Sequence, residues 1–173
     1  MKALSIRQPW AWAILHAGKR VENRDWRGCD YRGPVLLHAS KSVGTRADFD
    51  DACWGIADEA GVDPSDGPHA IADLGACPTY TPRASMDRVG IVGRARIDGV
   101  IRSADDLAHY GRDRAEYDRA QFWREEQAAW HTGGFALVLA DVEPLPFVPW
   151  RGALGLFEVP DDYAAQAATE VRR

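Results

Sequence analysis

The chain of 173 residues is poor in cysteine and lysine and contains no long apolar run. Cys29, Cys53 and Cys77 are widely spaced and form no Cys-x-x-Cys pair, which argues against a zinc knuckle or a disulfide framework. No apolar stretch approaches the roughly 20 residues that span a bilayer, and the start of the chain lacks the apolar segment of a secretory signal. We therefore expect a protein of the reducing cytoplasm that has no membrane partner.

Histidine spacing gives no sign of a metal site. His69, His109 and His131 stand far apart in the sequence, without the short intervals that bring ligands together. His38 ends an apolar run, where we expect an interior residue. The sequence therefore predicts no metal and no other cofactor.

Charge is unevenly distributed along the chain. The net charge of −5 at pH 7 argues against a surface covered with phosphate contacts. Basic residues nevertheless outnumber acidic ones between Arg7 and Arg46, and the acidic residues concentrate around 48–73 and near the C-terminus. A small basic region on an acidic chain fits a site for one nucleotide or a short single strand better than a long duplex.

Hydrophobic periodicity predicts about six strands with helices inserted between them in irregular order. The expected strands lie at 2–6, 20–24, 34–40, 89–101, 135–139 with a proline-rich irregular continuation, and 153–159. The expected helices lie at 10–17, 45–60 and 113–130, with a further helix start at Ser103. Because strands and helices do not alternate regularly, a doubly wound sheet is excluded. We predict an α+β fold, a mixed or antiparallel barrel with peripheral helices.

The domain organisation is simple. Residues 1–160 are expected to form one domain, and residues 161–173 a C-terminal helix or tail. The stretch 61–87 is rich in Gly, Pro and Asp and is predicted to be an irregular insertion.

Four stretches carry a family resemblance: LSIRQPWAWAILHAGKRVENRDW, YRGPVLLHASK, GIVGRARIDGV and FALVLADVEPLPFVPWRGALGLFEV. Together, through Q-P-W-A, G-K-x-V-E-x-R and R-G-P, they resemble the ASCH domain family of the PUA-like superfamily, over residues 2 to about 159. The resemblance implies a barrel with a cleft beside the first helix, and binding of RNA, DNA or modified nucleosides.

One branch of that family removes the acetyl group from N4-acetylcytidine, using a Lys, a Thr three residues later and a distant Glu. Lys19 matches the Lys, but position 22 is Glu22 rather than Thr. The resemblance therefore does not transfer the deacetylase activity.

Lys19, Glu22 and Arg24 are the central candidates. Lys19 could contact a phosphate, or act as a base if burial lowers its pKa; pairing with Glu22 is expected to raise that pKa, which favours a charged contact to a nucleotide over a neutral base. The alternative for Lys19 is a cation at a helix end. Glu22 could accept hydrogen bonds from an exocyclic amino group. Arg24 could contact a phosphate or form an ion pair along the strand.

Other candidates flank this group. Arg7 and Gln8 precede the first helix, where free N–H groups attract an anion, although Gln8 could simply cap the helix. Trp26 is expected to stack on a base, whereas Trp10 belongs to the apolar stripe unless it lines the cleft. Lys41 could contact phosphate or be a solvated surface residue.

The leading hypothesis is binding of RNA, single-stranded nucleic acid or a modified nucleoside. The predicted binding residues are Arg7, Gln8, Trp10, Lys19, Glu22, Arg24, Trp26 and Lys41. One alternative is an enzyme, an amidohydrolase or a ribonuclease, with Lys19 and Glu22 as catalytic residues. A second alternative is a protein-interaction module that docks through 61–87 and the acidic helices.

Overall fold

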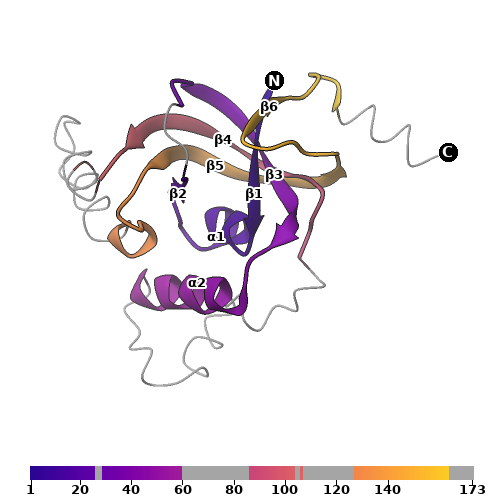
Figure 1. Ribbon diagram of the computed structural model, residues 1–173. Helices are drawn as coiled ribbons and strands as arrows, with labels where there is room; N and C mark the ends of the chain where they lie inside the picture. Colours follow the sequence, from indigo (N-terminus) through magenta and orange to yellow (C-terminus); the bar gives the residue numbers. More distant parts are fainter. Residues whose placement is uncertain (26–28, 60–85, 104–105, 107–126, 164–173) are drawn as a thin grey trace.

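The computed structural model describes residues 1–25, 29–59, 86–103, 106 and 127–163 (Figure 1). Trp26, nearly all of the predicted insertion 61–87, most of the predicted helix 113–130 and most of the tail 161–173 lie outside these ranges. In chain order the elements are β1 (Lys2–Gln8), α1 (Trp10–His16), β2 (Val21–Asn23), β3 (Gly33–Val43), α2 (Arg46–Glu59), β4 (Gly90–Ile101), the 3₁₀ helix η3 (Ala128–Trp130), β5 (Ala136–Pro149) and β6 (Leu156–Glu158).

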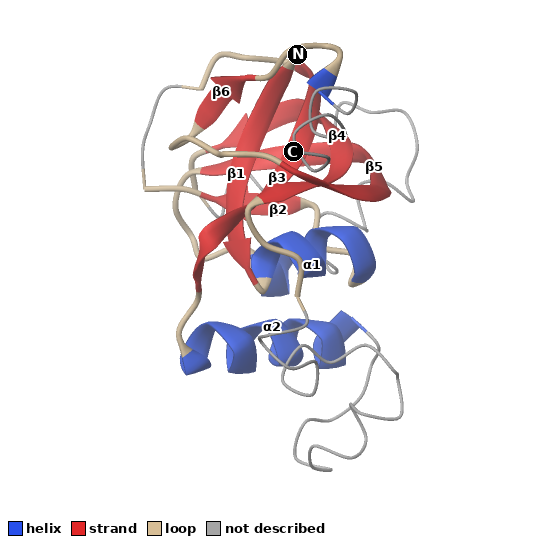
Figure 2. Cartoon of the chain, turned by 90° about the vertical axis from the view of Figure 1, so that its right-hand side faces the viewer, coloured by secondary structure: helices blue, strands red, loops and turns tan. Residues whose placement is uncertain are grey.

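The strands form one six-stranded mixed sheet in the order β2-β5-β4-β3-β1-β6. β1 and β3 are parallel, and the other neighbouring pairs are antiparallel. The sheet arches over α1, and α2 lies on the far side of that helix (Figures 1 and 2). The predicted α+β class and strand number are confirmed. Because β2 and β6 end the sheet, closure into a barrel stays a prediction.

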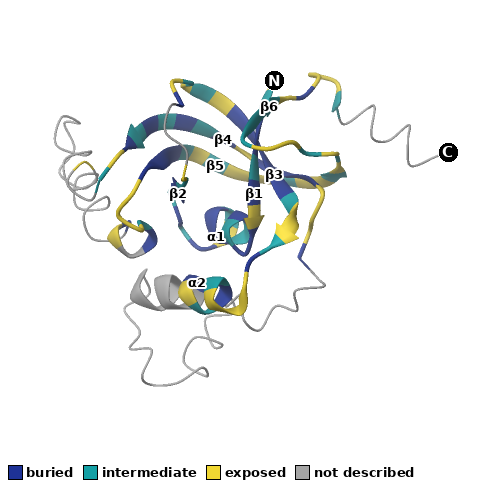
Figure 3. Ribbon diagram, viewed as in Figure 1, coloured by how far each residue is buried: buried dark blue, intermediate teal, exposed yellow. Residues whose placement is uncertain are grey.

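Apolar residues of α1 and the sheet account for this arrangement. The main core cluster joins Ala11 and Ile14 of α1 to inward-facing residues of the strands, among them Leu4, Leu37 and Leu137. A second cluster lies on the other side of α1 and includes Ala13, Ala17, Val21, Ala52 and Trp130. The sheet is correspondingly most buried where α1 lies against it (Figure 3).

The strand predictions hold with local differences. β1, β3 and β5 extend further than expected, and β6 begins only at Leu156. The proline-rich half of β5 pairs with β4 alone, since β2 covers only Ala136–Val138. It is therefore open on one side, which suits prolines that cannot donate a ladder hydrogen bond.

Candidate functional site

The turn after α1 carries Lys19. The helix ends at His16, and Gly18 adopts φ +71°, a left-handed conformation that reverses the chain at little steric cost. The next residue, Lys19, is 1% exposed and is among the largest fully buried side chains of the protein. A completely buried lysine is rare unless its ammonium group has partners.

Three groups surround the Lys19 ammonium. It donates a hydrogen bond to the Val21 carbonyl. It lies 3.9 Å from the nearer carboxylate oxygen of Glu22, and 5.7 Å from the centre of the Trp10 ring. The ring face of a tryptophan attracts a cation at this range. Carbonyl, carboxylate and indole together hold the Lys19 side chain inside the protein.

The pKa of Lys19 falls to about 8 from its ordinary 10.5. Burial is the largest cause because it disfavours the charged ammonium; Glu22 opposes the shift and the Arg24 cation adds to it. The prediction that Glu22 would leave Lys19 with a raised pKa is therefore wrong, because desolvation outweighs the attraction. Near pH 8 about half of the Lys19 side chains are neutral amines.

Glu22 and Arg24 complete this charge cluster, which consists of Lys19, Glu22 and Arg24. The Arg24 guanidinium lies 3.2 Å from the Glu22 carboxylate and donates a 2.7 Å hydrogen bond to the Ser5 carbonyl of β1. Glu22 and Arg24 therefore form the ion pair along the strand that was one of the two roles expected for Arg24. Arg20 does not join them, because its guanidinium turns back onto the Ile14 and Lys19 carbonyls.

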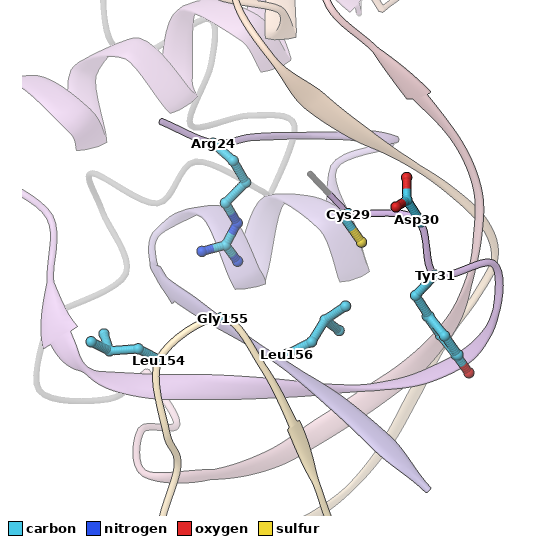
Figure 4. Close-up of a pocket in the computed structure, with 7 residues that line it drawn as sticks. All are labelled: Arg24, Cys29, Asp30, Tyr31, Leu154, Gly155 and Leu156. Carbon is cyan, nitrogen blue, oxygen red and sulfur yellow. The ribbon is translucent and has the colours of Figure 1, made fainter. Parts of the chain in front are cut away.

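A pocket borders the cluster at Arg24 (Figure 4). Its volume is about 610 Å³, which lies within the usual range for small-molecule sites. Its lining residues are Arg24, Cys29, Asp30, Tyr31, Leu154, Gly155 and Leu156. Arg24 and Cys29 enter from one side and the 154–156 segment from the other. Lys19 and Glu22 are buried and do not line the pocket.

The sequence did not single out the apolar lining. Cys29 and Leu156 come from segments more than a hundred residues apart, and both pack into the main core cluster or against it. Leu154 gave no local signal either, although an exposed fraction of 98% makes it the most exposed large apolar residue in the described ranges. The sequence pointed to this segment only as the expected strand 153–159, at the end of the last stretch that carries the family resemblance.

The residues before α1 take different positions. Gln8 is buried; its side chain accepts a 3.0 Å hydrogen bond from the Trp12 N–H and donates one of 3.0 Å to the Asp87 carbonyl. Gln8 thus has the capping role that was the alternative to anion binding. Arg7 and Lys41 are exposed. The Arg7 guanidinium lies 3.8 Å from the Asp48 carboxylate.

Trp10 lies between the Lys19 turn and α2. It is half-buried. Burial raises the pKa of Asp48, but hydrogen bonds from Thr45, the Arg7 cation and a hydrogen bond from the Trp10 indole together lower it. Asp48 also accepts from the backbone and hydroxyl of Thr45, which caps the start of α2. Trp10 therefore connects Lys19 to the second helix.

The described residues contain neither a metal-ligand cluster nor a membrane-spanning helix. Among the residues that the structure describes, no three His, Cys, Asp or Glu side chains gather as metal ligands. No helix in the same ranges has the length and apolar character needed to cross a membrane.

Comparison with known proteins places the chain in a family. A crystal structure of ASCH from Zymomonas mobilis has 12% identity and a TM-score of 0.46, covering 98% of this chain and 94% of that one. A single-residue variant of that protein gives 11% identity and a TM-score of 0.45, covering 97% and 96%. The comparison with curated proteins finds no match. The family model of the ASCH domain matches residues 4–159, and the chain therefore belongs to the ASCH domain family.

Proposed function

We propose that the protein binds RNA, another single-stranded nucleic acid or a modified nucleoside at the charge cluster and the pocket beside it. The observation that carries the proposal is the position of Arg24, which belongs both to the buried cluster and to the pocket wall. A pocket of mostly apolar lining with a small number of polar groups is the usual form of a small-molecule site.

The pocket supports recognition of a base in three ways. Leu154 and Leu156 offer apolar surface to a ring face. The Arg24 guanidinium is a fork of donors that matches paired acceptors on a base edge or a phosphate. Behind it, Glu22 could accept from an exocyclic amino group if a ligand displaced the guanidinium from its carboxylate.

Longer ligands would use exposed cations outside the pocket. Arg7 and Lys41 lie near the ends of the parallel strands β1 and β3, where Gln8 is paired with Val43. Both side chains are proposed phosphate contacts, and Trp26, two residues after Arg24, is the proposed stacking platform. The ligand is proposed to lie in a cleft beside the first helix, and the sheet is proposed to close into a barrel.

A fluorescence titration with short single-stranded RNA and DNA, and with free nucleosides, tests the proposal. Binding of the polymers should weaken as salt rises, and Lys41→Ala should lower the salt slope by about one. Leu154→Ala should weaken binding by roughly tenfold, because Leu154 lines the pocket and its exposure makes the change harmless to folding.

Phe147→Ala is the matched control for Leu154→Ala. Phe147 is another exposed large apolar residue, 40% exposed on β5, and it does not line the pocket. Its removal should leave affinity unchanged. Absence of binding to RNA, DNA and nucleosides by the folded protein would reject the proposal.

Hydrolysis is the second candidate function, and the lowered pKa of Lys19 is the observation that favours it. A neutral Lys19 amine could take a proton from a water molecule as that water attacks an acyl carbon. The C–N bond of the amide would then break, and the proton would pass to the leaving amine. The same base could activate a ribose hydroxyl in RNA cleavage.

Incubation with N4-acetylcytidine and with RNA separates this candidate from binding alone. Catalysis through Lys19 predicts a rate that rises with pH to a plateau above about 8 and is abolished in Lys19→Met. Equal product formation by wild type and Lys19→Met would remove Lys19 from the mechanism.

A further inference from the structure

Gln127 holds the two peptide groups that flank Lys19. Its side-chain oxygen accepts a 2.6 Å hydrogen bond from the Arg20 N–H, and its side-chain nitrogen donates a 3.1 Å bond to the Gly18 carbonyl. Gln127 is completely buried, with an exposed fraction of 0%. One carboxamide thus fixes the backbone immediately before and after Lys19.

A second carboxamide fixes the other end of the same segment. The Asn23 side chain donates a 2.8 Å hydrogen bond to the Trp130 carbonyl and accepts one of 3.2 Å from the Thr132 N–H. Residues 127–132 therefore hold the segment 18–23 at both ends. Lys19 and Glu22 lie between these two attachments.

The chemical nature of Gln127 suits its position beside a buried lysine. A carboxamide donates and accepts at once, so it bonds one N–H and one carbonyl without adding charge. A carboxylate there would favour the ammonium form of Lys19, and an apolar residue would remove both hydrogen bonds to the peptide groups that flank Lys19. A neutral side chain that both donates and accepts makes these two hydrogen bonds and adds no charge beside Lys19.

We propose that Gln127 is a positioning residue for Lys19, which it acts on by clamping the Gly18–Arg20 turn so that the ammonium stays buried against Trp10 and Glu22. This inference rests on the proposed function in one respect, that Lys19 takes part in it. Asn23 supports the clamp from its other end.

Titration of the lysine side chains by NMR tests this without any ligand. The protein has only three lysines, Lys2, Lys19 and Lys41, so a lysine-labelled sample gives three resolvable signals. Gln127→Ala lets water reach the ammonium, and Gln127→Glu adds a negative charge. Both changes should raise the pKa of Lys19 above its value of about 8, by on the order of one unit.

His131→Ala is the control, because His131 lies in the same segment but its side chain hydrogen-bonds the Gly134 carbonyl and not residues 18–23. It should leave the Lys19 titration unchanged. An unshifted Lys19 in folded Gln127→Ala and Gln127→Glu would overturn the proposal. If neither variant folds, hydrogen exchange in wild type decides. A slow Arg20 amide supports the clamp, and one that exchanges as fast as an open loop overturns it.

Ligand titrations with the same variants keep this inference separate from the proposed function. If wild type binds a short RNA oligonucleotide, Gln127→Ala should weaken that binding about tenfold while His131→Ala leaves it intact. Equal affinities of wild type and folded Gln127→Ala would overturn the positioning role. If wild type binds no nucleic acid or nucleoside, the proposed function fails, and the Lys19 titration still tests the clamp.

Discussion

Two buried polar clusters lie on either side of β1, and they are built on opposite principles. The first is the charge cluster of Lys19, Glu22 and Arg24. The second is neutral: the Ser5 hydroxyl lies 3.1 Å from Nδ1 of His38, and Nε2 of His38 lies 2.9 Å from the Trp150 carbonyl. A carbonyl can only accept, so Nε2 carries the proton and Nδ1 accepts from Ser5.

The difference lies in how completely each cluster is satisfied. In the neutral cluster the Ser5 hydroxyl, both ring nitrogens of His38 and the Trp150 carbonyl are hydrogen-bonded, and none of these groups carries a charge. The charge cluster places two cations around one carboxylate and keeps Lys19 in a position that disfavours its charged form. Buried groups with strongly shifted pKa values concentrate at functional sites, so the charged cluster is the better candidate for function and the neutral one for structure.

Ser5 connects the two clusters through its backbone. Its carbonyl accepts from Arg24, and its N–H donates a 3.2 Å bond to the Gly155 carbonyl in the pocket wall. Its hydroxyl hydrogen-bonds Nδ1 of His38. The neutral cluster therefore supports the strand segment from which the pocket is built, and the two regions can be disturbed separately.

The largest effect is expected from Glu22→Gln. This change leaves two cations facing each other in a site where Lys19 is 1% and Glu22 8% exposed, and breaking a buried ion pair in this way costs about 3–5 kcal/mol. Urea unfolding measures the loss. Glu143→Gln is the control, since it breaks the exposed 2.6 Å pair with Arg94 and should cost less than about 1 kcal/mol. Equal losses in the two variants would contradict a special role for burial.

The pH dependence of stability should differ between wild type and Lys19→Met. The pKa of Lys19 is about 8 in the folded protein and 10.5 in the unfolded chain. Between these values the unfolded chain binds more protons, so the free energy of unfolding rises with pH across this window, by up to about 3 kcal/mol. Below pH 8 the full penalty is present. Parallel stability curves for the two proteins would show that Lys19 has an ordinary pKa.

In the neutral cluster, Ser5→Ala should cost about 2 kcal/mol, because it leaves the buried Nδ1 of His38 without a donor. Ser40→Ala is the matched control: its hydroxyl makes an exposed 3.1 Å bond to the Ser42 carbonyl, so its loss should change stability by no more than about 0.5 kcal/mol. Chemical denaturation compares the two. A Ser5→Ala loss as small as that of Ser40→Ala would mean that water replaces the hydroxyl.

The smallest effect concerns acid pH and His38. Burial lowers the pKa of His38 below its ordinary 6.5, so the unfolded chain takes up the proton first as pH falls. The stability that neutral His38 provides is present above pH 6.5 and is lost as pH falls through the lowered value. The difference between the urea midpoints at neutral and at mildly acid pH should therefore be smaller in His38→Gln than in wild type. An equal acid sensitivity in both proteins would assign it to other groups.

Local patterns predicted most of the fold. The stripe of Ala13, Ile14 and Ala17 identified α1, and the apolar run at 34–40 identified β3, because both signals depend on neighbouring residues. The parallel pairing of β1 with β3 and the sheet order could not be predicted, since they depend on contacts between distant segments.

The structure brings the central candidate residues together, but their electrostatics differ from the expectation, and their role as a binding site stays a prediction. Lys19, Glu22 and Arg24, which the motif singled out, are neighbours in the structure, but the pKa of Lys19 was expected to rise, because spacing reveals a neighbouring charge and not the depth of burial. Gln127 gave no signal at all. Its partners lie more than a hundred residues away in the sequence, and no local pattern connects them.

The most direct test of the account is the pH titration of the three lysine side chains by NMR, in the free protein and with saturating short RNA or nucleoside. The account predicts that Lys19 titrates near pH 8 and that its signal moves when ligand binds. Lys2, whose pKa is raised by its bond to Glu158, should titrate above 10.5 and stay unmoved. A Lys19 that titrates together with Lys2 and does not respond to any ligand would contradict the central claim.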